Sequence, residues 1–161
     1  MKYKALGLFV LFILISFPAS AAVVSFTMVE TGLREDAAVT EYASLWEGGL
    51  MEAFFDAGHI VTNSPVLRLE TRPTGLSNGL EADFQDAIEG GAEFIIFGLL
   101  EFEIQAGRPV PSGIILKIYD TSSREMILEQ RFPAGSGRNL NEEYQIAHNA
   151  GRTLENYLRN R

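Results

Sequence analysis

The segment AEFIIFGLLEFEI, residues 92–104, decides the fold. Its first part, Phe94 to Phe97, is apolar without interruption, which is typical of a strand that is covered on both faces. After Gly98 the apolar residues alternate with Glu101 and Glu103, which is the pattern of a strand with one face in water. The sequence therefore predicts a central strand that is fully covered at one end and half-covered at the other.

The chain after this strand predicts an antiparallel meander followed by a helix. The stretch 105–113 holds two prolines and two glycines and is predicted to be a hairpin loop. Strands are expected at 114–119 and 126–132, joined by the polar turn 120–125. Apolar residues spaced three and four apart predict an amphipathic helix over 141–160, with Asn139 and Glu142 as a capping box.

The chain before residue 92 predicts strands that alternate with helices. A β-branched strand is followed by a long helix, a second strand, a loop and a shorter helix capped by Asn78 and Glu81. The second strand could continue after a bend, over residues 66–70. The expected bounds are 23–29 for the first strand, 35–57 for the long helix, 59–63 for the second strand, 71–79 for the loop and 80–89 for the shorter helix.

Two glycines lie in the middle of the long helix. Gly48 and Gly49 each weaken a helix by about 1 kcal/mol relative to alanine. A close approach of the helix to the sheet is the expected reason for keeping them. Gly58 is well placed to end the helix.

These elements predict a single α/β domain over residues 22–161. The strand–helix–strand units of the first half require parallel strands, whereas the meander requires antiparallel ones. The expected architecture is α/β (an α+β mixed sheet), in the order β-α-β-α-β-β-β-α. The sheet is expected to have five strands, with helices packed mainly on one face.

Residues 1–21 have the pattern of a secretory signal peptide. Lys2 and Lys4 precede the apolar run 5–17, which is shorter than the roughly 20 residues of a membrane-spanning helix. The segment PASA at 18–21 provides a helix breaker and an A-x-A cleavage site, so cleavage is expected before Ala22. Retention as an uncleaved anchor is the alternative. The domain is predicted to be periplasmic or otherwise extracytoplasmic, in a bacterium.

The predicted mature chain is strongly acidic. The formal net charge of −8 becomes −10 when residues 1–21 are removed, because they contain two lysines and no acidic residue. Binding to nucleic acid or to an anionic membrane requires basic patches, and none is visible. Neither is predicted as a partner, and no membrane span is expected after cleavage. The chain has no cysteine, which excludes disulfides and the acylated cysteine of a bacterial lipoprotein.

Three features together carry a resemblance to a known family. They are the segment GAEFIIFG (91–98), the strand–turn–strand LKIYDTSSREMILEQ (116–130) and the closing amphipathic helix. Together they resemble the domain shared by the N-terminal part of TolB, the curli secretion protein CsgG and the penicillin-binding-protein activator LpoB. The order of elements matches over nearly the whole of residues 22–161.

This resemblance implies a non-enzymatic envelope protein that binds partners or assembles, and it is compatible with a homo-oligomer. It transfers no site residues, because function inferred from a fold is analogy. The chain also departs from the pattern: it lacks the acylated cysteine, the membrane-spanning hairpins of a secretion pore and the propeller of TolB.

Candidate chemical groups are few. His59 could pair with Asp56 as a ligand or base, but it is expected to be a boundary residue, and His148 to have a surface or packing role. Glu101 and Glu103 share a strand face, as paired catalytic carboxylates can, although such groups are usually solvated on an exposed face. The sequence lacks metal-ligand, nucleophile-elbow and dinucleotide patterns. No catalytic residue, metal or cofactor is therefore predicted.

Loops offer the better candidates for contact with a partner. Trp46 could anchor a partner, but its place on the helical stripe favours core packing. The candidate loops are 71–79, 105–112 and 133–139. Arg72, Arg108 and Arg138 stand out on them in an acidic protein and are the candidate contacts, with simple solvation as the alternative.

Three functions follow as hypotheses. The favoured one is a soluble periplasmic accessory protein that binds or assembles with another cell-envelope protein through loops or a sheet edge. The alternative is a small-molecule or glycan-binding domain, and a carboxylate-dependent hydrolase is the third. An exposed apolar patch or free strand edge would favour the first, an enclosed pocket the second, and carboxyl groups with shifted pKa values in a cleft the third.

Overall fold

The computed structural model describes residues 21–34, 38–76 and 79–161, and six strands in this part form one mixed sheet. The strand order is β2-β1-β4-β5-β6, and the short β3 also pairs with β1. The bounds are β1 Val23–Thr31, β2 Ile60–Asn63, β3 Leu67–Leu69, β4 Phe94–Gln105, β5 Arg108–Asp120 and β6 Met126–Phe132. The predicted mixed sheet is confirmed. Its sixth strand, β3, is the segment expected to prolong the second strand.

The pairing follows the predicted division of the chain. β1 is parallel to β2, β3 and β4, whereas β4, β5 and β6 form an antiparallel meander. Helices α2 (Glu41–Asp56) and α3 (Leu80–Glu89) make the crossovers, and α4 (Leu140–Arg159) closes the domain. Residues 1–20 of the predicted signal peptide and Asn78, the expected cap of α3, lie outside the described residues.

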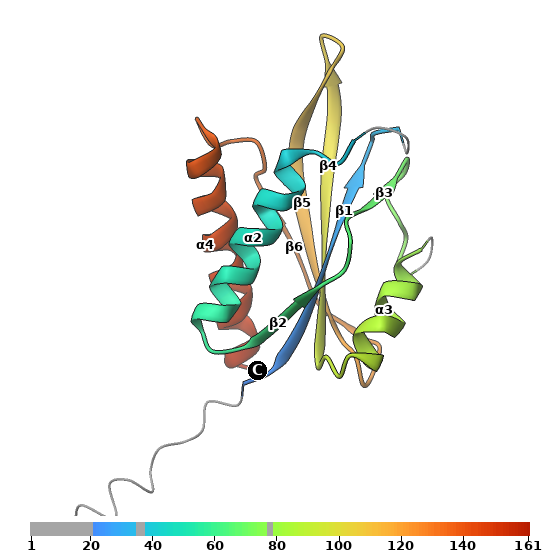
Figure 1. Cartoon of the computed structure of the whole chain (residues 1–161), viewed down its shortest axis with the longest axis vertical. Coiled ribbons are helices and arrows are strands. Elements are labelled where there is room, and N and C mark those ends of the chain that lie inside the picture. The colour runs from blue at the N-terminus through green and yellow to red at the C-terminus, as the bar shows by residue number, and fades with distance from the viewer. Residues whose placement is uncertain (1–20, 35–37, 77–78) are drawn as a thin grey trace, which may run out of the picture.

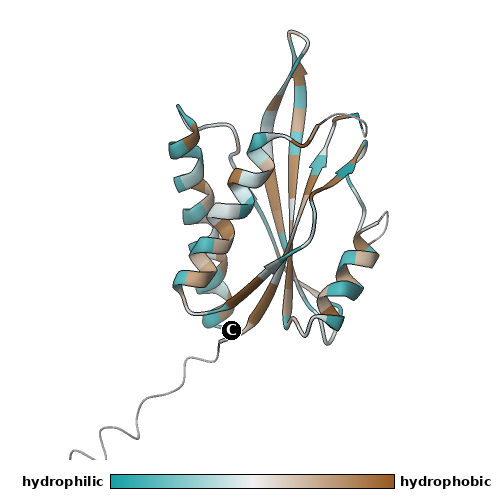
Figure 2. Cartoon of the chain, in the orientation of Figure 1, coloured by the Kyte–Doolittle hydropathy of each residue, from teal (hydrophilic) through white to brown (hydrophobic). Residues whose placement is uncertain are grey.

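The sheet has a hydrophobic core on each face. Helices α2 and α4 cover one face and α3 covers part of the other (Figure 1). Along β5, Ile114, Leu116 and Ile118 belong to the α2/α4 core, whereas Ile115 and Tyr119 belong to the α3 core. Figure 2 shows the apolar colour along the central strands and the polar colour on the outer sides of α3 and α4. This confirms that the middle of the sheet is covered on both sides and that helices lie mainly on one face.

Helix α2 begins later than predicted. The expected start at residue 35 is wrong, because residues 38–40 are not helical and the first helical residue is Glu41. Thr40 donates from its backbone N–H to the buried carboxylate of Glu30, at 2.9 Å, and its hydroxyl also donates there. These bonds fasten Thr40 to β1 in an extended conformation. The predicted end is confirmed, since Gly58 follows with a φ of +90°.

Of the two glycines of α2, Gly49 serves a contact with α4 and not with the sheet. A Cβ on Gly49 would lie 2.8 Å from the Cβ of Ala147 and 2.9 Å from the backbone oxygen of Tyr144. Opposite it, a Cβ on Gly151 would lie 2.8 Å from the Cβ of Ala53. The expected helix–sheet approach is therefore wrong at Gly49. Glycine allows two helix backbones to meet, since no larger side chain fits between them.

The region 105–113 forms strand and not a long hairpin loop. β4 runs to Gln105 and β5 starts at Arg108, so Ala106 and Gly107 alone form the turn. Pro109 and Pro111 lie two residues apart in β5 and are paired opposite Ile104 and Phe102 of β4. Proline is tolerated in a strand whose N–H side has no neighbour. β6 pairs only with the part of β5 from residue 114 onward, so that side is open here.

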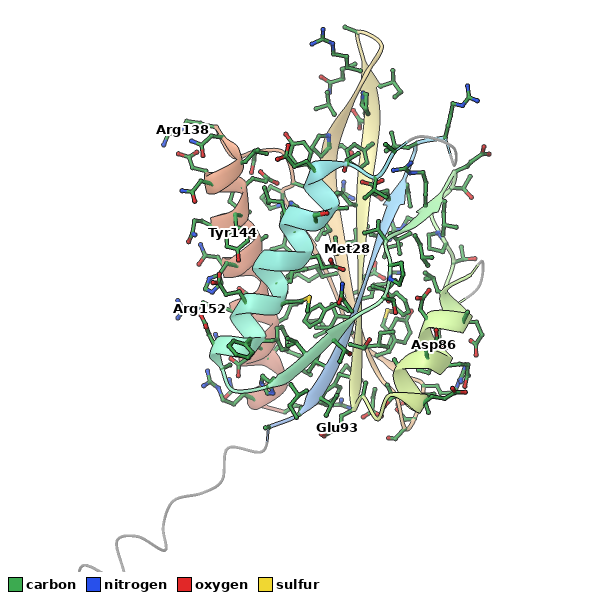
Figure 3. All side chains as sticks on the ribbon, in the orientation of Figure 1. Met28, Asp86, Glu93, Arg138, Tyr144 and Arg152 are labelled. Atoms are coloured by element: carbon green, nitrogen blue, oxygen red, sulfur yellow. The ribbon has the colours of Figure 1, made fainter. Side chains whose placement is uncertain are left out.

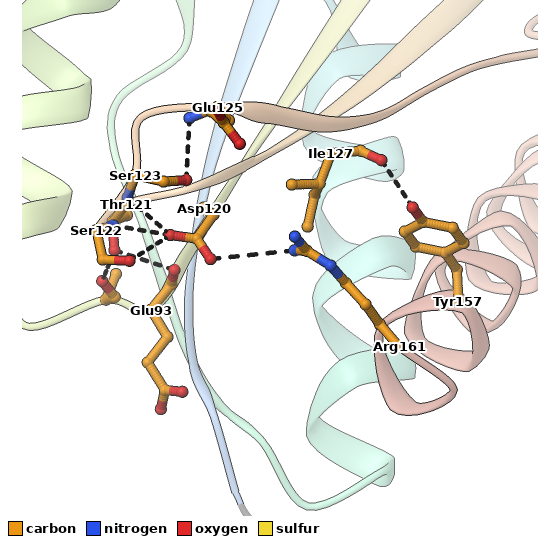
Figure 4. Close-up of polar contacts among 10 residues, drawn as sticks. Glu93, Asp120, Thr121, Ser122, Ser123, Glu125, Ile127, Tyr157 and Arg161 are labelled. Atoms are coloured by element: carbon orange, nitrogen blue, oxygen red, sulfur yellow. Dashed lines mark hydrogen bonds and ion pairs between the residues drawn. The ribbon is translucent and has the colours of Figure 1, made fainter.

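The turn between β5 and β6 is held by Asp120. Its carboxylate accepts hydrogen bonds from the backbone N–H groups of Ser122 and Ser123, both at 3.0 Å (Figure 4). Near this turn, the hydroxyl of Tyr157 on α4 donates to the backbone oxygen of Ile127 at 2.8 Å. The predicted polar turn is confirmed, and the end of α4 is attached to the edge strand of the sheet.

The helix contact predicts opposite effects for two adjacent substitutions. Gly49→Ala should lower the free energy of unfolding by about 1–3 kcal/mol, because the new methyl group overlaps backbone atoms of α4. Gly48→Ala should be neutral or raise it by up to about 1 kcal/mol, because its methyl group would meet only the ring of Tyr144, at 3.4 Å. Urea denaturation of both variants is the measurement. Equal stability of the two would contradict the proposed contact.

Candidate functional site

The outer half of the β4–β5 hairpin stands apart from the rest of the sheet. β1 ends opposite Glu101 of β4, and β6 ends opposite Ile114 of β5. In the described part of the chain, residues 102–111 therefore pair only with each other, and Figure 1 shows them as a ribbon that projects from the body. A two-stranded ribbon is marginal in water by itself, and each free edge offers unpaired backbone groups.

The projecting ribbon is exposed from Glu103 to Pro109. Ile104 is 62% exposed, among the largest values for an apolar side chain in the described residues. Phe102 and Pro111, at the base of the ribbon, are buried. The ribbon therefore has a fixed base and a free end that carries an apolar side chain. We call residues 103–110 the hairpin tip.

Ion pairs hold the base of the hairpin on the sheet face that α3 leaves uncovered. Arg131 lies 2.7 Å from Glu101, and Arg72 lies 3.7 Å from Glu101 and 3.3 Å from Glu129. Lys117 lies 3.2 Å from Glu129. Glu101 is thus neutralised by two arginines, whereas Glu103 lies on the exposed hairpin tip. The two carboxylates that were predicted to share a face therefore have different surroundings. Their contacts do not resemble those of a catalytic acid–base pair.

The three candidate arginines lie in three different segments: two loops and the start of β5. Arg72 belongs to the ion pairs at the hairpin base. Arg138 is 88% exposed and pairs with Glu142 at 2.6 Å, and hydrogen bonds from Arg138 lower the pKa of Glu142. Arg108 is the first residue of β5 and lies on the hairpin tip, where it makes no ion pair with another described residue. Their role as partner contacts stays a prediction.

The loop 133–139 is fastened from inside by Glu143. This carboxylate is 1% exposed and accepts hydrogen bonds from the backbone N–H groups of Gly135, at 2.7 Å, and Gly137, at 2.9 Å. It also accepts one from the indole of Trp46, at 2.8 Å. Trp46 is fully buried, which confirms core packing. The sequence did not reveal Glu143, because a glutamate in the first turn of a helix is an ordinary surface residue.

Both histidines lie at the opposite end of the molecule from the hairpin. His59 Nε2 lies 3.6 Å from Glu155, and His148 Nε2 lies 3.6 Å from Asp56. Asp56 thus pairs with His148, and not with His59 as one hypothesis had it. A pocket of about 400 Å³ contains His59, and a neighbouring one of about 280 Å³ contains His148. Figure 3 shows Glu93, which lines the first pocket, at this end and Arg138 at the other.

Burial raises the pKa of two carboxyl groups outside these pockets. Desolvation is the main cause at both Glu47 of α2 and Asp83 of α3, and hydrogen bonds from Asn63 and Ser64 respectively act against it. These two partners are adjacent at the end of β2, so the two carboxyl groups approach it from opposite faces of the sheet. In the described residues, no group of three or more acidic, histidine or cysteine side chains could hold a metal ion.

The fold resembles that of a few solved structures. No protein-family model and no curated protein matches the chain. Among solved structures, the PelC dodecamer from Paraburkholderia phytofirmans is similar with a TM-score of 0.50 and 14% identity, over 79% of this chain and 83% of that one. At this identity the likeness shows a shared fold and nothing further.

Two weaker structural similarities involve TolB and LpoB, two of the proteins that the sequence pattern resembles. The LpoB C-terminal domain from Escherichia coli has a TM-score of 0.42 and 11% identity, over 69% of this chain and 80% of that one. TolB from Acinetobacter baumannii has a TM-score of 0.40 and 13% identity, over 88% of this chain but 28% of that one. Such scores carry no argument about function. The resemblance to CsgG stays a prediction.

One further observation concerns the membrane. Within the described ranges, none of the helices combines the length and the apolar composition needed to span a bilayer. The comparisons indicate no enzyme family.

The shifted carboxyl groups predict two pH profiles of opposite sign. The raised pKa of Glu47 means that its charge destabilises the folded state above pH 4.5, and one of its oxygens is buried without a hydrogen-bond partner. Glu47→Gln should therefore raise the free energy of unfolding at pH 7, by at most roughly 0.5 kcal/mol after allowance for solvent screening. This gain should shrink as the pH falls below the folded-state pKa and should be gone below pH 4.5, where Glu47 is protonated in both the folded and the unfolded state.

Asp120→Asn is the matched control. Hydrogen bonds, mainly from Ser122, lower the pKa of Asp120 below 3.8, so its charge stabilises the fold above that pH. Loss of this charge in Asp120→Asn should lower the free energy of unfolding by roughly 0.5 kcal/mol at pH 7, after allowance for solvent screening. The difference from wild type should disappear only as the pH falls through the lowered pKa of Asp120. Chemical denaturation between pH 3 and pH 7 measures both. A Glu47→Gln variant less stable than wild type at pH 7 would contradict the assignment.

Proposed function

We propose that this protein is a soluble extracytoplasmic accessory protein that binds or assembles with another cell-envelope protein, and that the β4–β5 hairpin makes the contact. The observation that carries the proposal is the free hairpin tip. Its two edges lack neighbouring strands in the described chain, and it carries the exposed Ile104. Strand edges of this kind bind partners by adding a strand, and an apolar side chain adds affinity at the centre of the contact.

The base of the hairpin supports the same role. Arg72 and Arg131 fix Glu101, and the register shifts between Glu101 and Phe102, where the ribbon leaves the sheet. A bulge re-aims a strand at such a point. A ribbon with a fixed base is presented to a partner in one direction, which lowers the entropy lost on binding. Of the candidate arginines, Arg108 is the one that the hairpin would place against this partner.

The comparisons leave the partner open. The PelC structure that shares the fold is a dodecamer, so the partner of the hairpin in this protein could equally be a second copy of the chain.

The proposal predicts that partner capture depends on the hairpin tip. A tagged domain comprising residues 22–161 is used to capture proteins from its own envelope extract, with mass spectrometry as the readout. In one variant Asn-Gly replaces residues 103–110, which closes the paired residues Phe102 and Pro111 with a two-residue turn. This variant should lose the partner, and Ile104→Ser should reduce its recovery by about tenfold, which corresponds to about 1.4 kcal/mol.

Phe55→Ser is the matched control for Ile104→Ser. Phe55 is 68% exposed and lies at the end of α2, away from the hairpin, so its loss removes a similar apolar side chain from another surface. This variant should capture the partner as well as wild type does. Sedimentation of each variant shows whether the partner is a second copy. If the shortened hairpin captures the same partner as wild type, the hairpin is not the contact.

A further inference from the structure

Ala22, the first residue of the predicted mature domain, is buried and hydrogen-bonded on both sides of its backbone. Ala22 is 7% exposed, and its backbone oxygen accepts a hydrogen bond from the N–H of Ile60 at 3.0 Å. Its own N–H donates to Nδ1 of His59 at 3.2 Å. The next residue already belongs to β1, which lies between β2 and β4 in the sheet. The predicted cleavage point is therefore at the very edge of the folded domain.

His59 connects this N–H to a buried carboxylate. Because Nδ1 accepts a hydrogen bond, the proton of a neutral imidazole lies on Nε2. Nε2 faces Glu155, which is only 7% exposed, at 3.6 Å. The guanidinium of Arg159 lies on the other carboxylate oxygen, at 3.4 Å, but is 64% exposed. Ala22, His59 and Glu155 thus form one polar chain that leads from the surface into the domain.

These groups line the pocket of about 400 Å³ where the chain enters the sheet. Its polar side chains are His59, Glu93, Glu155 and Arg159, and its apolar wall includes Phe94 and Leu158. Figure 1 shows that the start of β1, the end of α2 and the C-terminus meet at this end of the molecule. Two carboxylates and one exposed arginine make the pocket acidic, which suits a cation better than a neutral amide.

We propose that cleavage between Ala21 and Ala22 creates an α-ammonium group that stays in this pocket, bound to His59 and paired with the carboxylates of Glu155 and Glu93. In the cleavage, which a signal peptidase of the envelope catalyses, water breaks the bond between the Ala21 carbonyl carbon and the Ala22 nitrogen. The carbon gains the hydroxyl group and the nitrogen gains a proton. The free amine, with an ordinary pKa of about 8, takes up a second proton at neutral pH.

The new group fits the pocket better than the peptide N–H that it replaces. A peptide nitrogen donates one hydrogen bond, whereas an ammonium donates three, so two more can go to the carboxylates of the pocket. Burying a charge is costly unless it is paired and hydrogen-bonded; His59 already accepts a hydrogen bond from this nitrogen, and Glu155 and Glu93 line the same pocket. The mature N-terminus is therefore a structural group of the domain.

The same geometry fixes the order of events. A protease needs its substrate in an extended and accessible form, yet the residues after the cleavage point are locked in β1 between two neighbouring strands. Cleavage must precede the pairing of β1. The proposal rests on the predicted cleavage point and is independent of partner binding.

The test compares the mature chain with an extended one. The full chain is exported from its own signal peptide, and intact mass gives the N-terminus, which is expected to be Ala22. The second protein carries Gly-Ser-Gly-Ser before Ala22. Lys117 is the one lysine after residue 21, so acylation with an amine-specific ester at pH 7 has only two targets, which peptide mapping separates. The α-amine of the mature chain should react at least about tenfold more slowly than that of the extended chain.

Thermal unfolding provides the second readout. The mature chain should melt about 3–6 °C above the extended one. Glu155→Gln should remove most of this difference and raise the acylation rate of the mature chain, with little effect on the rate of the extended chain. Glu93→Gln provides the same comparison if Glu155→Gln does not fold. A mature N-terminus other than Ala22, equal acylation rates in the two chains, or equal effects of Glu155→Gln on both melting temperatures would each overturn the proposal.

Discussion

The central position of β1 is the constraint on which the rest of the structure depends. In the described chain each parallel pairing includes β1, which binds β2 and β3 on one side and β4 on the other. Its side chains divide between the two cores, with Val24, Phe26 and Met28 toward α2 and α4, and Val29 toward α3. The crossovers through α2 and α3 return the chain to β1, so that β2 and β4 pair on either side of it. Because β1 is also the first strand in the described part of the chain, the sheet can close only when the residues of β1 are available.

Glu30 shows how the same strand positions the loops. This carboxylate is fully buried in β1, and it binds Thr40 before α2 and Arg68 in β3. An isolated buried charge would be strongly destabilising, but these partners neutralise it and satisfy its oxygens. Arg68 in turn donates to the backbone oxygen of Ala38. One buried glutamate thus fixes the start of a helix and the bend of an edge strand.

Periodicity was sufficient to predict the elements of this fold, but not the contacts among them. The order of strands and helices, the Asn139 cap and the stop at Gly58 depend on neighbours in sequence, and the structure confirms them. The start of α2 depends on Glu30, ten residues away, and the role of Gly49 depends on Ala147. The first residues of β5 were predicted to be part of the hairpin loop because Pro109 and Pro111 usually mark a loop. They fit a strand here only because β6 ends before reaching them.

The two ends of the molecule differ in how far their polar groups have partners within the chain. At the end where β1 begins, His59 and His148 each face an acidic partner within the chain, and the pocket there lies beside Ala22. At the hairpin end, the base is neutralised by ion pairs while the tip keeps open edges, Ile104 and Arg108. Unsatisfied backbone edges and exposed apolar area are what a binding partner can cover. On a domain of strongly negative charge, a contact built from an aliphatic side chain and one arginine also avoids the repulsion that an acidic partner would meet elsewhere on the surface.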